Sequence, residues 1–320
     1  MIKQLDSRLH PGAPTELAEE RPLMRLLGTR RTPDGTRLRW AGEGAGLTDI
    51  TVELLLRDSP DHSPGLCELT VEATKLPVLD MESVSIAFPF LVDTPTVRYD
   101  RQRGWVEPRA DHGPGSSNEW LSATSAVTVT AQDGPGVVWA APDSALFSSS
   151  DLVRGVWPER FPEKNGYLYA YVMNNFWPCN TPPTQPGRVR FRYVFAAVDR
   201  HEPASASRFG ARARFGALAQ EVTPLDRFTE TRQPRFAQGT LLDLGDMPDC
   251  RVFLTGEEDG LTLRLANLRA GGNRDIALRV PDGYRAVESA GAVPSADGRL
   301  RPRLNGFGVT ELFLRPSEPQ

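Results

Sequence analysis

The sequence predicts an all-β fold, in which a large β-sandwich domain is followed by a smaller β-sandwich unit. Glycine and proline number 28 each, so turns are frequent. Short runs rich in valine, threonine and aromatic residues recur between the turns, and they outnumber long helical patterns. A chain of 320 residues can hold one large hydrophobic core and a second, smaller one.

The clearest strand covers residues 188–197, where apolar residues alternate with arginines. A period of two is typical of a strand that buries one face. The apolar face carries Val189, Phe191, Tyr193, Phe195 and Ala197, and the other face carries Arg188, Arg190 and Arg192. The arginine face is expected to meet either solvent or a partner domain.

Further strands are expected in order along the chain, with residues 1–46 only weakly patterned. The expected runs are 23–27, 37–40, 49–57, 66–73, 82–91, 126–131, 136–141, 167–173, 251–255, 261–267, 275–280 and 310–314. The turn at 58–62 indicates a hairpin between the third and fourth of these runs. The run at 167–173 shows no strict alternation, which predicts cover on both of its faces.

Residues 98–120 and 143–166 have the pattern of long loops. Loops of this length are usually functional or disordered, and Tyr99, Trp105 and Trp120 argue against disorder. The best helix candidate is the alanine-rich segment 204–221.

The helix candidate marks a change in composition, which sets the expected domain boundaries. Residues 1–200 are predicted to form the large domain and residues 241–320 the small one, with a helical connector at 201–240. Gly210 and Gly216 weaken the helix.

Charge and cysteine content exclude several classes of protein. The net charge of −4 gives neither a nucleic-acid footprint nor a basic membrane-binding face. The sequence contains no apolar run of the ~18 residues expected of a spanning helix and no apolar signal core at its start. Cys67, Cys179 and Cys250 are widely spaced, which disfavours a disulfide framework or zinc cluster and favours a reducing cytoplasm.

Residues 174–186 form the most unusual stretch, because amides and aromatic residues are interleaved with four prolines. The prolines exclude a helix, so we expect a structured loop between two antiparallel strands. Amides beside an aromatic platform suit sugar hydroxyls and a pyranose face. The candidate substrate-binding residues are Asn174, Asn175, Trp177, Asn180 and Gln185. The alternative is that the amides bond the loop's own backbone and that the tryptophan lies in the core.

Four motifs occur in a recognisable order. They are Glu82-Ser-Val with Phe88-Pro-Phe90, Asp111-His-Gly-Pro-Gly115, the 174–193 pattern ending in Phe191-Arg-Tyr193, and Leu263-Arg-Leu-Ala-Asn267. This set resembles the C-terminal β-sandwich region of family 38 glycoside hydrolases, the α-mannosidase type. The resemblance covers roughly residues 47 to 315. It implies a galactose-mutarotase-like supersandwich with a smaller C-terminal β-sandwich.

The resemblance also implies a role without catalysis in this chain. In the family, the zinc and the aspartate nucleophile belong to an N-terminal barrel, and no His-x-Asp motif supplies them here. We therefore expect no cofactor in this chain, with zinc in a separate catalytic domain. The expected partners are a carbohydrate and a catalytic barrel protein, so the chain would be a split companion or a fragment that lends loops to a sugar cleft.

A second hypothesis is a free-standing mutarotase-like or lyase-like enzyme. It needs a histidine and a carboxylate on one face, for which His112 with Asp111 or Glu119 is the only local set. Turn chemistry explains Asp111 equally well, and Asp111 and His112 are also candidate substrate-binding residues. A third hypothesis is a purely structural interaction module.

The tryptophans predict where a partner would dock. Trp105, Trp120, Trp157 and Trp177 fall in or beside long loops. If the chain docks on a barrel, these loops should gather at one side and form an aromatic surface.

Overall fold

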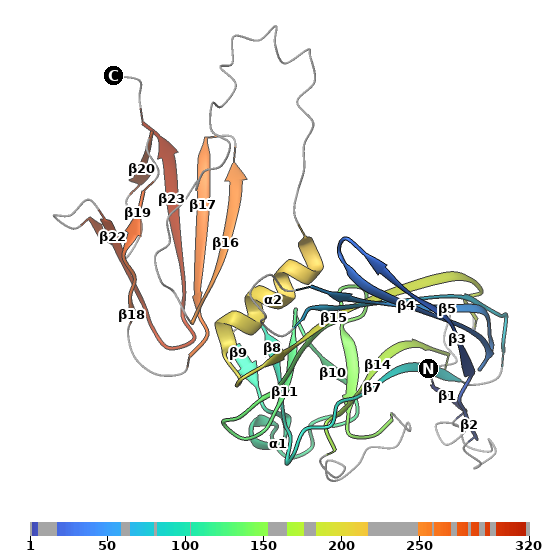
Figure 1. The fold of residues 1–320 in the computed structure, drawn as a ribbon. Coiled ribbons are helices and arrows are strands. Elements are labelled where there is room, and N and C mark those ends of the chain that lie inside the picture. Colours follow the sequence, from blue (N-terminus) through green and yellow to red (C-terminus); the bar gives the residue numbers. More distant parts are fainter. Residues whose placement is uncertain are drawn as a thin grey trace, which may run out of the picture. The chain divides into compact units, whose positions relative to one another are not determined.

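The computed structural model shows an all-β chain with two short helices among its described residues (Figure 1). It describes residues 2–5, 18–58, 65–79, 82–102, 104–152, 165–175, 184–216, 249–257, 259–269, 274–280, 283–287, 292–294 and 299–317. The chain divides into two compact units. The larger contains residues 1–202 and 206–214, and the smaller contains residues 203–205 and 215–320.

One sheet of the larger unit has six antiparallel strands. In spatial order they are β10 (Leu121–Ser122), β13 (Leu146–Ser149), β14 (Tyr167–Asn174), β7 (Ser83–Pro89), β1 (Ile2–Leu5) and β2 (Ala18–Glu20).

The second sheet has nine antiparallel strands. In spatial order they are β3 (Leu23–Thr32), β4 (Gly35–Gly44), β5 (Leu47–Arg57), β6 (Cys67–Lys75), β15 (Gly187–Val198), β12 (Gly136–Ala140), β11 (Val127–Thr130), β8 (Thr96–Arg101) and β9 (Gly104–Val106). The pairing of β5 with β6 confirms the predicted hairpin.

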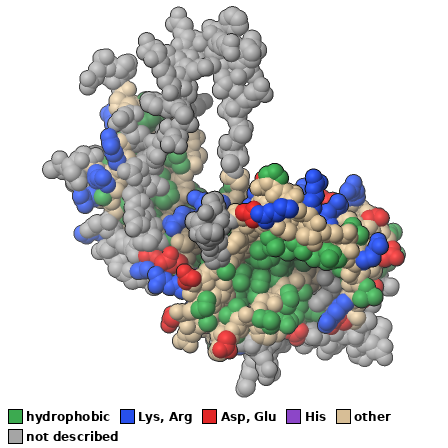
Figure 2. All heavy atoms as spheres, in the orientation of Figure 1, with side chains coloured by type: hydrophobic (Ala, Val, Ile, Leu, Met, Phe, Trp, Pro, Cys, Tyr) green, Lys and Arg blue, Asp and Glu red, His purple; other side chains and the backbone are tan. Residues whose placement is uncertain are grey.

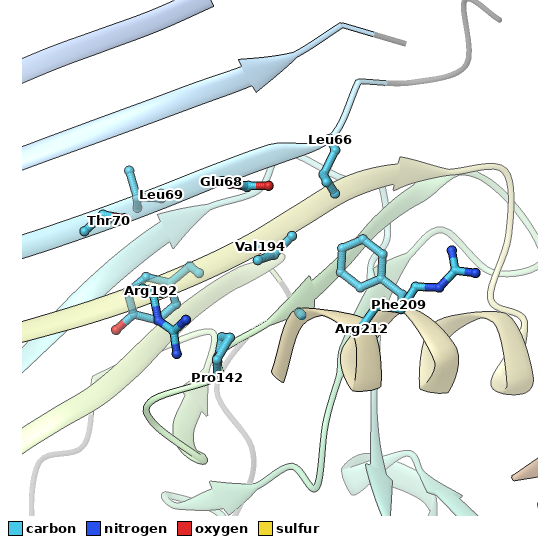
Figure 3. Close-up of a pocket in the computed structure, with 11 residues that line it drawn as sticks. Leu66, Glu68, Leu69, Thr70, Pro142, Arg192, Val194, Phe209 and Arg212 are labelled. Carbon is cyan, nitrogen blue, oxygen red and sulfur yellow. The ribbon is translucent and has the colours of Figure 1, made fainter. Parts of the chain in front are cut away.

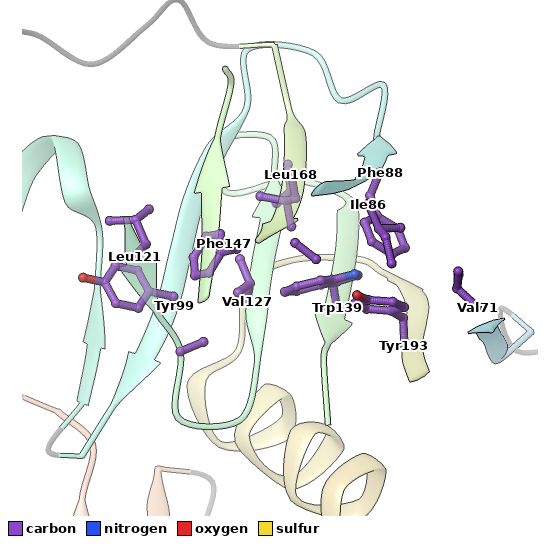
Figure 4. Packing of buried hydrophobic residues seen from close by; sticks show 13 residues of the cluster. Val71, Ile86, Phe88, Tyr99, Leu121, Val127, Trp139, Phe147, Leu168 and Tyr193 are labelled. Atoms are coloured by element: carbon purple, nitrogen blue, oxygen red, sulfur yellow. The ribbon is translucent and has the colours of Figure 1, made fainter. Parts of the chain in front are cut away.

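The main core lies between these two sheets, and both contribute to it (Figure 4). Trp139 and Tyr193 from the nine-stranded sheet stack with ring centroids 5.8 Å apart. Phe88 and Phe147 from the six-stranded sheet pack against Trp139. The larger unit is therefore a β-sandwich, as predicted.

Alternation places the side chains of β14 and β15 as the period-two rule requires. The predicted apolar face of β15 points inward at Tyr193, which is buried, while Arg192 is exposed. On β14, Leu168 and Ala170 are fully buried, whereas Tyr167 and Tyr169 are half-buried. The predicted lack of strict alternation agrees with a bulge between Tyr171 and Met173 near the end of β14, and Tyr171, on the face opposite Leu168 and Ala170, is also buried.

Two expectations about the sequence required correction. The supposed loops contain regular structure: β8, β9 and α1 (Pro108–Asp111) lie within or across 98–120, and β13 lies within 143–166. These strands are short and their alternation covers too few residues to be recognised.

The expectation that residues 174–186 connect two paired antiparallel strands was also wrong. β14 belongs to the six-stranded sheet and β15 to the nine-stranded sheet, so the two strands are not neighbours.

Helix α2 (Pro203–Phe215) covers part of the outer face of the nine-stranded sheet. Ala206 and Phe209 pack with Val138 of β12. Gly210 permits this contact, because a Cβ there would lie 2.6 Å from the Ser125 carbonyl carbon. The helix ends before Gly216, whose φ of +61° is a left-handed conformation.

The smaller unit has its own core, built between two short sheets. One contains β16 (Cys250–Glu257), β17 (Gly260–Asn267), β23 (Val309–Pro316) and β20 (Tyr284–Val287); the other contains β18 (Arg274–Asp275), β22 (Arg299–Leu304), β19 (Leu278–Arg279) and β21 (Ala292–Pro294). Leu263 and Leu265 on β17 are fully buried against Leu278 and Leu304.

Apolar side chains also reach the surface of the larger unit. Figure 2 shows them gathered over the region where β14 and β7 face β15. Of the four tryptophans predicted to form a docking surface, Trp105 and Trp120 are half-buried. The Trp105 indole donates to Ser207 Oγ at 3.2 Å. Trp157 and Trp177 lie outside the described residues, so the predicted aromatic docking surface stays a prediction.

Candidate functional site

The outer face of the six-stranded sheet carries a row of tyrosines. Because Leu168 and Ala170 point into the core, Tyr167, Tyr169 and Tyr171 point the other way. Tyr169 pairs with Ser148 of β13, and Tyr171 pairs with Ser85 of β7, so these serines share the face. We call this set, with Ser83, the tyrosine face.

One end of the tyrosine face is a buried polar cluster. Tyr171 and Glu119 are 6% and 7% exposed. The Trp120 ring meets the Tyr171 ring edge-on, with centroids 6.3 Å apart. Burial raises the pKa of Tyr171, and the nearby Glu119 charge acts in the same direction, while Trp120 and Ser83 beside the hydroxyl oppose it. Tyr171 is therefore a neutral hydroxyl at ordinary pH.

The other end of the tyrosine face is accessible. Tyr167 and Tyr169 are half-buried, with ring centroids 6.4 Å apart. Burial raises the pKa of Tyr169, as do the charges of Asp151 and Glu19, whereas Arg21 lowers it. In such a surface, the aromatic rings can stack on the apolar face of a sugar ring, and the neighbouring carboxylate and guanidinium groups can form hydrogen bonds with the sugar hydroxyls.

Ser148 adds a polar group on this face that lacks a partner. Its side chain is buried, and within the described part of the chain its Oγ has no hydrogen-bond partner. Buried hydroxyls are normally paired. Ser148 lies opposite Tyr169, so a ligand hydroxyl or a water at the tyrosine face could satisfy it.

The predicted residue Asn175 holds two chain segments together at the end of β14. Its Oδ1 accepts the Glu82 backbone N–H at 2.6 Å, and its own N–H donates to the Glu82 carbonyl at 3.0 Å. Its Nδ2 donates to the Val78 carbonyl at 3.3 Å. The amide therefore bonds backbone rather than a ligand, but this backbone belongs to the segment 78–82 and not to the loop itself, as the alternative had it.

The remaining residues of the 174–186 stretch are not brought to one place by the described structure. Asn174 and Gln185 are exposed, at the end of β14 and just before β15. Trp177 and Asn180 lie outside the described residues. Their sugar-binding role stays a prediction.

A buried ion pair lies directly beside Asn175. Lys75 Nζ and Glu82 Oε1 are 2.5 Å apart, and the two side chains are 6% and 3% exposed. Lys75 ends β6 in one sheet, and Glu82 precedes β7 in the other, so the pair joins the two sheets. Alternation could have placed the Lys75 side chain inward, since Val71 and Ala73 precede it on the inward face of β6.

Asp111 and His112 both stabilise the segment that contains α1. The Asp111 carboxylate accepts the Glu107 backbone N–H at 2.7 Å, as turn chemistry predicts. His112 Nε2 lies 3.0 Å from the Tyr99 hydroxyl, and its Nδ1 lies 3.4 Å from Asn118 Oδ1. His112 is half-buried.

A separate groove of about 350 Å³ lies on the outer face of the nine-stranded sheet, against α2 (Figure 3). Arg192 and Thr70 line its floor, and Phe209 and Arg212 line one wall. Arg192 binds Asp143 through two N–H groups, from Nε at 3.0 Å and Nη2 at 2.8 Å. This pairing lowers the pKa of Asp143.

Within the described residues, no group of three histidine, cysteine or acidic side chains is placed to hold a metal ion. A search of the same residues finds no helix long and apolar enough to cross a membrane.

Comparison with known proteins identifies a similar fold. No family model and no curated protein matches this sequence. Among solved structures, the chain is similar to an α-mannosidase from Enterococcus faecalis V583, with a TM-score of 0.61 and 12% sequence identity. The match covers 98% of this chain and 38% of the α-mannosidase chain. The likeness shows a shared fold, and the chain spans well under half the length of that neighbour.

Proposed function

We propose that this chain is the carbohydrate-associated β portion of an α-mannosidase-like glycoside hydrolase, and that it binds sugar without cleaving it. The observation that carries the proposal is the difference between the two coverages of the fold match. Nearly the whole chain aligns with 38% of an α-mannosidase chain. The reaction would then belong to a partner that supplies a catalytic barrel and its zinc.

The tyrosine face supports the sugar-binding part of this proposal. Tyr167 and Tyr169 offer half-exposed aromatic rings, and Glu19, Arg21 and Asp151 lie near enough to act on the pKa of Tyr169. Sugar sites combine an apolar platform with a few convergent polar groups. Tyr169 and Tyr171 have raised pKa values, so their hydroxyls stay protonated and act as hydrogen-bond donors rather than bases.

Binding is tested with methyl α-mannoside by saturation-transfer NMR on the purified chain. Tyr167→Ala and Tyr169→Ala should each weaken binding roughly tenfold, the change that ~1.4 kcal/mol of lost stacking gives. The control is Tyr284→Ala, because Tyr284 is also half-buried but lies in the smaller unit. Binding that is unchanged in both test variants would overturn the role of the tyrosine face.

The absence of catalysis is tested with 4-nitrophenyl α-mannoside and zinc. The chain alone should give no turnover above the buffer rate, while addition of a barrel-bearing α-mannosidase chain should. Turnover by the chain alone that disappears in Glu119→Gln would contradict the proposal, since Glu119 is the buried carboxylate beside Tyr171.

A further inference from the structure

The edge strand β3 exposes an unusual amount of apolar surface. β3 pairs with β4 on one side, and no described strand pairs with its other side. Leu23, Leu26 and Leu27 are 92%, 52% and 48% exposed. The unpaired backbone groups of a long edge strand are a template for another strand.

Leu26 is the open end of an apolar row that crosses five strands. Leu26 lies opposite Trp40, Trp40 opposite Val52, and Val52 opposite Val71. Val71 lies opposite Phe191, and it is buried in the main core. An apolar side chain placed beside Leu26 would extend this row by one strand.

We propose that β3 pairs antiparallel with β3 of a second copy of this chain, about a two-fold axis at Leu26. The two Leu26 side chains then face each other and join two apolar rows into one. The paired stretch covers residues 23–29. It contains Arg25 opposite Leu27, so no arginine faces another arginine, and Arg30 and Arg31 fall outside it.

The geometry of the sheet favours this two-fold arrangement over a chain of copies. The opposite edge of the same sheet is β9, which has only three residues and cannot cover a ten-residue strand. A two-fold pair uses up the β3 edge of each copy and therefore closes. This inference does not depend on the proposed sugar-binding role.

Two features of β3 oppose its pairing with a strand of another copy. One is the bulge between Leu26 and Gly28, and the other is the presence of the exposed charged residues Arg25 and Arg30 on the edge strand; both kinds of feature protect sheet edges from partners. The self-association of the full chain decides between the two effects.

Sedimentation velocity of the full chain over a range of concentrations is the first test. The wild-type chain should sediment as a dimer at high concentration, and Leu26→Asp should sediment as a monomer with an unchanged circular dichroism spectrum. Leu254→Asp is the matched control, since Leu254 is 43% exposed on β16 of the smaller unit. A monomeric wild type, or an equal loss of dimer in Leu254→Asp, would overturn the proposal.

Cysteine cross-linking tests the register with milder substitutions. Directly opposed Cα atoms in an antiparallel pair lie about 4.5–5.5 Å apart, within reach of a disulfide. Leu26→Cys should therefore form a covalent dimer faster than wild type under oxidation. Leu23→Cys should not, because its two copies would lie roughly 20 Å apart. Since Leu23 is more exposed than Leu26, random collisions would give the reverse order, and that order would overturn the register.

Discussion

β14 and β15 flank the same short segment, yet they differ in how deeply their polar side chains are buried. Each sends one set of side chains into the shared core, Leu168 and Ala170 from β14 and Tyr193 from β15. On its other face, β14 carries Tyr171 within a buried polar cluster. On its other face, β15 carries arginines whose side chains are 48% to 86% exposed.

The ion pairs near the two strands show the same difference. Beside the end of β14, Lys75 and Glu82 are almost fully buried, whereas Arg192 and Asp143 are 48% and 27% exposed. Removing one partner of a buried pair leaves an uncompensated charge, but an exposed pair contributes little to stability. The polar groups near β14 should therefore hold the sandwich together, and those on β15 should be replaceable.

The largest predicted effect is on the buried pair. Glu82→Gln should lower the free energy of unfolding by about 3–5 kcal/mol, because the Lys75 charge stays buried without its partner. Urea unfolding followed by tryptophan fluorescence measures this in the larger unit, which contains all six tryptophans.

Two variants control this measurement. Glu72→Gln removes an acid from the outward face of the same β6 strand, where it pairs with Arg190, and should change stability by about 1 kcal/mol or less. Lys75→Met with Glu82→Leu replaces both charges and should recover most of the loss. A loss in Glu82→Gln no larger than in Glu72→Gln would remove the contrast between the strands.

His201 offers a second, intermediate test, because it is a half-buried polar group on the β15 side. It follows β15, and its Nδ1 lies 2.9 Å from Thr128 Oγ1. Burial and, to a lesser extent, the Arg98 charge lower the pKa of His201 from 6.5 to about 4, and the Glu202 charge opposes this shift.

The sign of the pH effect follows from this lowered pKa. Between pH 6.5 and about 4, the unfolded chain binds a proton that folded His201 does not, so acid favours unfolding. His201→Gln should flatten the fall in the free energy of unfolding across this range. Thr128→Val removes the hydrogen bond but keeps the imidazole, and it should retain the slope. Equal slopes for wild type and His201→Gln would show that His201 does not titrate in this way.

Alternation along strands made much of the fold predictable. The inward face of β15 from Val189 to Phe195, the hairpin of β5 with β6, and β16, β17 and β23 of the smaller unit follow from period-two patterns, whereas β20, β21 and β22 were not predicted. β8, β9 and β13 did not, because strands of three to six residues show too few alternations to stand out among proline, glycine and serine. The glycine at 210 weakened the helix prediction, although its close contact with Ser125 is what lets α2 pack on the sheet.

The candidate site was less predictable, because its parts come from distant segments. The Tyr-x-Tyr-x-Tyr pattern of residues 167–171 was a readable signal, but its meaning depends on Ser148 and Ser85 in the neighbouring strands. The pairing of Lys75 with Glu82 depends on how the two sheets pack, which no local pattern specifies. Asn175 was selected for its amide, and the structure shows that amide bonded to the backbone of Glu82 and Val78.

The smallest predicted effect concerns Arg192, and it tests the β15 side of the contrast. Arg192→Gln breaks a two-bond contact with Asp143, which in a buried setting would be severe. With Arg192 about half exposed, solvent screens the charges, so the free energy of unfolding should fall by about 1 kcal/mol or less. The Arg192 backbone N–H also donates to Asp143 at 2.9 Å, and this bond survives the substitution and keeps the carboxylate in place. Urea unfolding at low and high salt provides the measurement, and the wild-type advantage should shrink as salt screens the pair. A loss near that of Glu82→Gln, unaffected by salt, would mean that Arg192 supports the sandwich as strongly as the buried pair does, and the distinction between the two strands would fail.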